Sequence, residues 1–143
     1  MSAYLFSHDP AAIDRERVHR WLSEESYWAR GRSRAVQDAA IDASRNYGVY
    51  RSDTGAQVAY ARVVTDGVTF AWLCDVFVDP TERGHGIGKM LVGGVIDELA
   101  PLGLGRVMLA TADAHGLYAA FGFVPLAAPG RMMAIEGGAS RRP

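Results

Sequence analysis

The hydrophobic residues of this chain gather in short apolar runs that predict β-strands. The run from Thr69 to Val78 is almost continuously apolar, as expected of a central strand that is covered on both faces. Its aromatic residues Phe70 and Trp72 are therefore expected in the core. Turn residues at Ser52–Gly55 and at Asp66-Gly67 separate neighbouring runs and predict hairpins. The other runs predicted as strands are Ala3–Phe6, Tyr47–Tyr50, Gln57–Val64, Arg106–Ala110, Phe123–Val124 and Met132–Ile135.

Other apolar residues recur at helical spacing. Every fourth residue from Ile87 to Leu99 is apolar, which predicts a helix with one buried face, ended by the proline and glycine that follow. Further helices are predicted after the Asp9-Pro10 cap, at Ala35–Arg45 and at Ala114–Phe121. Strands and helices in this order predict an α/β fold: one domain whose mixed, twisted central sheet is flanked by helices.

Composition narrows the class of protein. The 143 residues suffice for one domain, and 49% hydrophobic with 22% charged residues is typical of a globular chain. A net charge of −1 argues against a nucleic-acid partner, although Arg30, Arg32 and Arg34 form a local positive cluster. Cys74 is the only cysteine, so no intrachain disulfide can form. Without a leader or an apolar run near the ~20 residues of a membrane span, a cytoplasmic protein with no membrane partner is expected.

The most informative segment runs from Arg83 to Lys89, where three glycines join an apolar strand to a helix. Glycine permits a positive φ, so successive N–H groups and the helix N-terminus can face an anion such as a pyrophosphate. The spacing fits neither a P-loop nor a dinucleotide fingerprint, because Lys89 is followed by Met90 and no third glycine stands where G-x-G-x-x-G requires one. A glycine-rich turn that binds no ligand is the alternative.

This loop, preceded by a Val-Phe-Val strand, resembles the acetyl-CoA loop of the GNAT superfamily of N-acetyltransferases. A second segment, Leu117 to Phe123, is similar to the Leu-Tyr-x-x-x-Gly-Phe sequence that often follows the fifth strand of these proteins. With the order of elements, the resemblance covers roughly residues 47–135. It implies a single GNAT-like domain at residues 1–136, followed by a disordered tail at 137–143, and acetyl-CoA as co-substrate.

The resemblance also implies which residues hold acetyl-CoA. The main chain of the Val-Phe-Val strand is expected to pair with the pantetheine arm, and the loop with the pyrophosphate. Thr111 stands where many members have an asparagine that contacts pantetheine. The expected cofactor-binding residues are Val76, Phe77, Val78, Arg83, Gly84, His85, Gly86, Ile87, Gly88, Lys89 and Thr111.

Acetyl transfer to an amine needs a proton for the departing thiolate and, ordinarily, a base. The resemblance assigns the first task to Tyr118, whose phenol stays protonated at neutral pH; its alternative is an aromatic that packs the helix on the sheet. Asp75 is the only charge in its apolar strand, so it is either a base or acceptor-binding group or half of a buried ion pair. A buried, inert thiol is favoured for Cys74 over a nucleophile. His115, three residues before the tyrosine, could relay a proton, but a surface or capping histidine is favoured.

The acceptor is expected at the polar and aromatic loop after the first helix. Tyr27, Trp28 and Arg30 in this loop could bind a planar or anionic acceptor, or the aromatic pair could only pack the helices on the sheet. No His/Cys/Asp cluster shows metal-ligand spacing, so no metal is expected. The resemblance therefore implies an N-acetyltransferase that acts on a primary amine of a small molecule or peptide by direct attack in a ternary complex. Dimers are common among similar proteins, so a homodimer is one expected assembly. A catalytically weak acyl-CoA-binding regulatory domain is the alternative.

Overall fold

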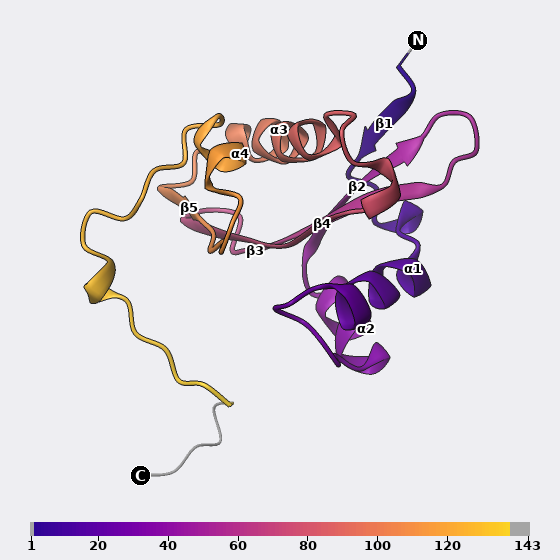
Figure 1. Ribbon diagram of the computed structural model, residues 1–143. Helices are drawn as coiled ribbons and strands as arrows, with labels where there is room; N and C mark the ends of the chain where they lie inside the picture. Colours follow the sequence, from indigo (N-terminus) through magenta and orange to yellow (C-terminus); the bar gives the residue numbers. More distant parts are fainter. Residues whose placement is uncertain (1, 138–143) are drawn as a thin grey trace.

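The computed structural model describes residues 2–137, which form a five-stranded sheet with helices on both faces (Figure 1). The strands follow one another across the sheet in chain order; β1 to β4 are antiparallel neighbours and β5 is parallel to β4. The predicted fold class, a mixed central sheet flanked by helices, is confirmed. The strands are β1 (Tyr4–Ser7), β2 (Arg45–Arg51), β3 (Gln57–Thr65), β4 (Phe70–Val78) and β5 (Arg106–Met108).

Within residues 2–137 four α-helices accompany the sheet. α1 (Arg15–Arg20) begins after Asp14, whose side chain accepts a hydrogen bond from the N–H of Arg17. The predicted start of this helix at Asp9-Pro10 is wrong, because those residues form a separate 3₁₀ turn, Pro10–Ala12. A π-helical turn, Trp21–Glu25, continues α1. The other helices are α2 (Arg34–Asp42), α3 (Ile87–Leu99) and α4 (His115–Ala119).

Each face of the sheet has its own hydrophobic core. α3 packs Leu91, Val92 and Val95 on one face, and α1 with α2 cover the other (Figure 1). Residues buried in the second core include Val18 of α1 and Ile41 of α2. No helix in the described range 2–137 combines the length and the hydrophobicity that a membrane span requires.

β4 differs from the expected strand that is covered on both faces. Buried and partly exposed residues alternate along it, so Trp72 is only partly buried and Phe70 is 38% exposed. Their assignment to the core is therefore wrong. The physical reason is that one face of β4 beyond Ala71 borders an open cleft rather than a helix.

A β-bulge interrupts β4. Tyr60 pairs with Phe77 and Arg62 with Cys74, so two residues of β4 stand opposite Ala61 alone. At the bulge Asp75 has φ +54°, the only positive φ of a non-glycine residue in the described part of the chain. A bulge shifts which face later side chains take, and indeed the strand contributes Leu73 to the α3 core but Phe77 to the opposite core.

The two final strands predicted at Phe123–Val124 and Met132–Ile135 are not formed; residues 121–137 contain only turns and the 3₁₀ turn Pro129–Arg131. After α4 the chain runs away from the sheet as an extended arm (Figure 1). Without a neighbouring strand, the backbone there has no ladder to join, whatever its side chains favour. Residues 138–143 of the predicted disordered tail lie outside the described residues.

The close approach of α3 to β1 depends on a glycine and gives a first prediction. A Cβ atom on Gly94 would lie 2.5 Å from the ring of Phe6, which stacks on Tyr47. Gly94→Ala should therefore lower the free energy of unfolding by about 1–3 kcal/mol through overpacking, although alanine favours a helix by about 1 kcal/mol. Urea unfolding measures the change. In Gly116→Ala, the control in α4, the new methyl meets nothing within 4 Å and should not destabilise the protein; equal stability of both variants would refute the packing account.

Candidate active site

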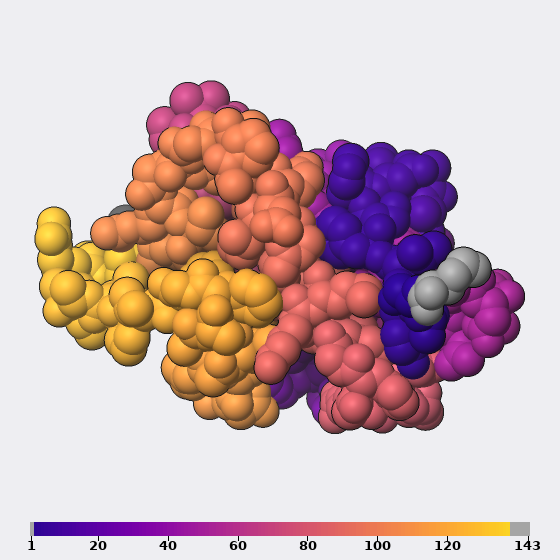
Figure 2. All heavy atoms as spheres, turned by 90° about the horizontal axis from the view of Figure 1, so that it is seen from above, coloured from indigo at the N-terminus to yellow at the C-terminus, as the bar shows by residue number. Residues whose placement is uncertain are grey.

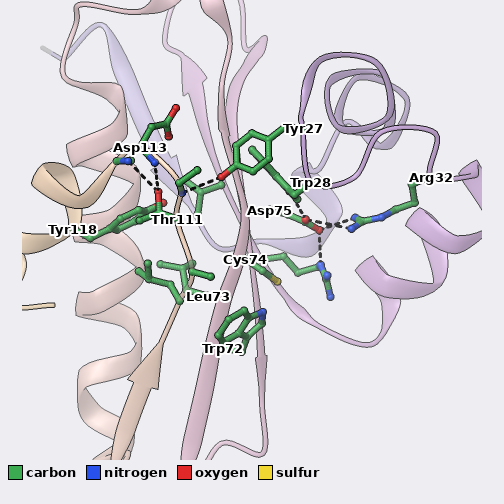
Figure 3. A pocket seen from close by; sticks show the side chains of 16 residues that line it. Tyr27, Trp28, Arg32, Trp72, Leu73, Cys74, Asp75, Thr111, Asp113 and Tyr118 are labelled. Carbon is green, nitrogen blue, oxygen red and sulfur yellow. Dashed lines mark hydrogen bonds and ion pairs between the residues drawn. The ribbon is translucent and has the colours of Figure 1, made fainter. Parts of the chain in front are cut away.

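The sheet opens where β4 and β5 diverge. The two strands pair only over Phe70–Trp72 and Arg106–Met108, so β5 offers no partner to residues 73–78 of β4. A cleft of about 560 Å³ lies at this opening. Figure 3 shows its side chains coming from β4, the connection after β5 and the loop after α1. Its lining consists of Tyr27, Trp28, Arg32, Arg62, Trp72, Leu73, Cys74, Asp75, Val76, Leu109, Ala110, Thr111, Ala112, Asp113, Ala114 and Tyr118.

The glycine loop leads from the end of β4 to α3. Among the described residues, none accepts a hydrogen bond from the N–H groups of residues 83–89, so these donors and the helix N-terminus are open to an anion. Gly84 and Gly86 have φ of +86° and +74°, a backbone that L-residues adopt only with strain. Arg83 and Lys89 are exposed and form no ion pair with a described residue. The loop therefore has the chemistry of a phosphate site.

Three further loop residues, His85, Ile87 and Gly88, have side chains or Cα positions that contact other parts of the protein. His85 holds the loop through Nδ1, which lies 2.9 Å from the carbonyl oxygen of Glu82. The Ile87 side chain is buried in the α3 core. Gly88 faces Leu117 of the α4 region, 3.5 Å from where its Cβ would lie. These residues could contact a cofactor only through the main chain or, for His85, through the ring edge.

Tyr118 lies on α4 and forms part of the cleft wall (Figure 3). The residue is 8% exposed, and its hydroxyl makes no hydrogen bond to another described residue. Burial, together with the nearby Tyr27 and Asp113, raises the pKa of Tyr118 to about 12. The phenol is therefore protonated throughout the physiological range and can donate a proton into the cleft.

Thr111 and Tyr27 shape the wall opposite β4. The hydroxyl oxygen of Thr111 accepts hydrogen bonds from the N–H groups of Ala114 at 3.0 Å and Asp113 at 3.4 Å. This fixes the turn into α4 and leaves the hydroxyl proton free to donate. The Tyr27 hydroxyl accepts a hydrogen bond from the N–H of Ala112 at 3.1 Å and so bridges the cleft from the loop after α1.

Asp75 lies at the centre of a buried polar cluster (Figure 3). It is 4% exposed, and its carboxylate accepts hydrogen bonds from Arg32 Nη1 at 2.8 Å, Arg62 Nε at 2.9 Å and Trp28 Nε1 at 2.9 Å. Burial alone would raise the pKa of Asp75, but the hydrogen bonds and charges of the two arginines outweigh it and lower the pKa below its usual value. Such a carboxylate is a poor proton acceptor, so the geometry favours the ion pair over the base.

The structure brings some predicted residues together and leaves others apart. Val76 borders the cleft, whereas Phe77 buries its ring against Trp21, with 5.5 Å between ring centroids, and could bind a ligand only through its main chain. Val78 likewise packs on the α3 core. Arg30 does not reach the cleft: it is exposed and donates to the carbonyl oxygen of Glu24.

Sequence reasoning gave no site role to four polar or aromatic residues of the cleft: Arg32, Arg62, Trp72 and Asp113. A signal existed for Arg62, the only charged residue in the run Gln57–Val64, because the next strand also carries a single charge at Asp75. Lone opposite charges in consecutive apolar strands are expected to pair. Cys74 also borders the cleft, but burial raises its pKa to about 11, so its thiol stays protonated and is a weak nucleophile.

Comparison with known proteins decides the family. The sequence model of the acetyltransferase (GNAT) family matches residues 15–123. The chain belongs to the GNAT acetyltransferase family. A crystal structure of a Xanthomonas campestris GNAT-family protein is 42% identical, with a TM-score of 0.88 and 94% of each chain covered. A Gibberella zeae protein, named provisionally as an acetyltransferase, is 34% identical over 80% of this chain and 75% of its own length.

A more distant structure shares the fold alone. The N-acetylglutamate synthase of Neisseria gonorrhoeae, complexed with coenzyme A and N-acetyl-glutamate, is 18% identical with a TM-score of 0.65, over 85% of this chain and 28% of its own. The resemblance stated from the glycine loop and the Leu-Tyr segment is thus confirmed, and this GNAT protein is an acetyltransferase by family.

The polar cluster of this GNAT protein gives a second prediction. Asp75→Asn keeps the shape and tolerates the positive φ, but it leaves two partly buried guanidinium groups without a carboxylate partner. The free energy of unfolding should fall by about 3–5 kcal/mol near pH 7, measured by urea titration. The control is Asp113→Asn, which alters a cleft carboxylate that is exposed and forms no ion pair with a described residue. Its free energy of unfolding should differ little from that of the unsubstituted protein.

The difference in the free energy of unfolding between Asp75→Asn and the unsubstituted protein should depend on pH, because the pKa of Asp75 is lowered in the folded protein. A carboxylate whose pKa is lowered by folding stabilises the protein at pH values above its pKa in the unfolded chain, about 3.9. This stabilisation is lost as the pH falls through the pKa of the folded protein. The difference in the free energy of unfolding between Asp75→Asn and the unsubstituted protein should therefore disappear in acid. A gap that is absent at pH 7 would refute the ion-pair account.

Proposed function

We propose that this protein transfers the acetyl group of acetyl-CoA to a primary amine of a small molecule or peptide by direct attack in a ternary complex. The observation that carries the proposal is the open edge of β4 at residues 73–78, which joins the unpaired N–H groups of residues 83–89 at one end to the Tyr118 cleft. One extended ligand with a pyrophosphate and an acyl thioester matches these features.

Acetyl-CoA would bind mainly through main-chain groups. Its pyrophosphate would accept hydrogen bonds from the loop at residues 83–89, with Arg83 and Lys89 adding charge. Its pantetheine arm would pair with the free edge of Val76–Val78 in the manner of an added strand, and the hydroxyl of Thr111 would donate from the opposite wall. The acetyl thioester would then lie beside Tyr118.

In the transfer step the amine nitrogen attacks the thioester carbonyl carbon, so a C–N bond forms and the C–S bond breaks. A main-chain N–H of the β4 edge would stabilise the oxyanion, and Tyr118 would donate a proton to the departing sulfur. The amine loses one proton in return. Asp113 is the cleft carboxylate with no ion pair among the described residues, so we propose that it or a water beside it accepts that proton, rather than Asp75.

The acceptor would lie between the aromatic walls of the cleft. Trp28 and Trp72 offer flat apolar surface, and Tyr27 closes the rim. At the β4 wall of the cleft two guanidinium groups, those of Arg32 and Arg62, surround the carboxylate of Asp75, whereas the second cleft carboxylate, Asp113, comes from the connection after β5. The positive charge is therefore in excess only at the β4 wall, and there it favours amines that also carry an anionic group such as a carboxylate.

The proposed activity is tested by measuring release of free CoA from acetyl-CoA over a panel of amines. The panel should contain pairs that differ only in a carboxylate, such as phenylalanine with phenethylamine and tryptophan with tryptamine. Acetylated product with the carboxylated member as the better substrate is expected. Tight CoA binding without turnover of any amine would instead indicate a regulatory acyl-CoA-binding domain.

The role of Tyr118 gives a third prediction. Tyr118→Phe should lower kcat about 10²-fold with little change in affinity for acetyl-CoA, because the ring stays and only the donor is lost. Since the pKa of Tyr118 lies at about 12, the size of the loss should not depend on pH between 6 and about 9. Tyr50→Phe is the control: its buried hydroxyl has no partner among the described residues and lies outside the cleft. Full activity of Tyr118→Phe would leave the residue a packing role only.

A further inference from the structure

The glycine loop at residues 83–89 is tied to strands β1 and β2 through the residue that directly precedes it, Glu82. The Tyr4 hydroxyl of β1 donates to Glu82 Oε2 at 2.5 Å, and Arg51 Nη1 of β2 donates to Oε1 at 2.8 Å. The Glu82 side chain is only 13% exposed. Among the described residues, no other side chain of the sheet forms a hydrogen bond to residues 80–89. These two contacts therefore fix where the loop begins.

Tyr4 and Arg51 are set as a pair by the sheet itself. They stand directly opposite each other in the antiparallel register of β1 and β2, so their side chains project from the same face. Because β3 separates these strands from β4, the segment after β4 passes the end of β3, where the N–H of Asp79 donates to the carbonyl oxygen of Val58 at 2.8 Å. Figures 1 and 2 both show this segment beside the N-terminal strand. One carboxylate thus joins the start of the loop to two strands that do not neighbour β4.

Glu82 also holds the loop from within. Its carbonyl oxygen lies 2.9 Å from His85 Nδ1, and Asp79 caps the 3₁₀ turn that ends at Glu82. Beyond that point Gly84 and Gly86 have positive φ, and no described residue accepts a hydrogen bond from the loop N–H groups. Such a loop loses conformational freedom when a ligand orders it, and an anchor at its start reduces that cost.

We propose that Glu82 is a positioning residue for the cofactor: held by Tyr4 and Arg51, it sets the loop amides in the arrangement that binds the pyrophosphate of acetyl-CoA. This inference rests on the proposed function and deepens it, because it concerns the anionic end of that cofactor. A carboxylate beside an anion site would by itself oppose binding, but Arg51 neutralises this one. The hydrogen bonds from Tyr4 and Arg51 lower the pKa of Glu82, so the anchor is ionised at neutral pH. Its contribution is therefore to the geometry of the loop.

The test compares CoA with pantetheine, which lacks the pyrophosphate and the nucleotide. Tyr4→Phe removes one hydrogen bond without changing a charge and should raise the Kd for CoA about 3-fold. Glu82→Gln breaks the ion pair as well and should raise it about 10-fold. Pantetheine should bind to both variants as it binds to the unsubstituted protein. Titration calorimetry measures the affinity for CoA, and NMR chemical-shift titration measures the weaker affinity for pantetheine.

The control variant is Asp53→Asn. Asp53 accepts hydrogen bonds from Arg51 Nε and Nη2, each at 3.0 Å, but it forms no hydrogen bond to the loop. This substitution therefore removes a carboxylate partner of Arg51 and leaves Glu82 in place. The affinities of Asp53→Asn for CoA and for pantetheine should equal those of the unsubstituted protein.

The contrary results have separate meanings. Equal weakening of CoA and pantetheine would give Glu82 a general structural role and overturn the proposal. Unchanged or tighter binding of CoA by either variant would also overturn it, because loss of the carboxylate charge alone strengthens the binding of an anion. An unsubstituted protein that binds CoA no more tightly than pantetheine would refute the pyrophosphate site of the proposed function, and this inference with it.

Discussion

The buried ion cluster of Asp75, Arg32 and Arg62 is the interaction on which the candidate active cleft depends. A carboxylate that is 4% exposed is tolerated in the sheet only because two guanidinium groups and an indole N–H surround it. Through Arg62 the cluster joins β4 to β3, and through Arg32 it joins β4 to the loop after α1. It thereby holds the bulge at a positive φ that an isolated strand would avoid.

The bulge has consequences along the rest of β4. A bulge bends its strand, and β4 pairs with β5 only as far as Trp72, before the bulge is reached. The gap leaves a free main-chain edge that ends at the glycine loop and the N-terminus of α3. An ion cluster, an open strand edge and a loop with unpaired N–H groups thus follow one another within one stretch of chain. Asp75 can therefore shape the cleft without accepting a proton.

Some of this arrangement could be predicted from the sequence because it is local. The glycine loop and the apolar face of α3 depend on residues close together in the chain, and both appear where expected. The pairing of Asp75 with Arg62 is indicated only by lone opposite charges in two consecutive apolar strands. Its pairing with Arg32 depends on a loop 43 residues away, which no short pattern encodes. The strand expected at Met132–Ile135 illustrates the same limit, because its backbone would have to lie beside a sheet edge, and the chain after α4 leads it away from the sheet (Figure 1). Arg30 and Arg32 belong to the same polar loop, and only the fold shows that Arg32 reaches Asp75 while Arg30 donates to the carbonyl oxygen of Glu24.

We infer that acetyl-CoA binds to main-chain groups at the glycine loop and along the open edge of β4. Amide hydrogen exchange with and without saturating CoA tests this most directly, because it measures each N–H group rather than overall affinity. The account predicts that CoA slows exchange at residues 83–89 and at the free edge of residues 73–78, while the hairpin between β3 and β4 stays unchanged. Unaltered exchange at both segments, with CoA bound, would contradict it.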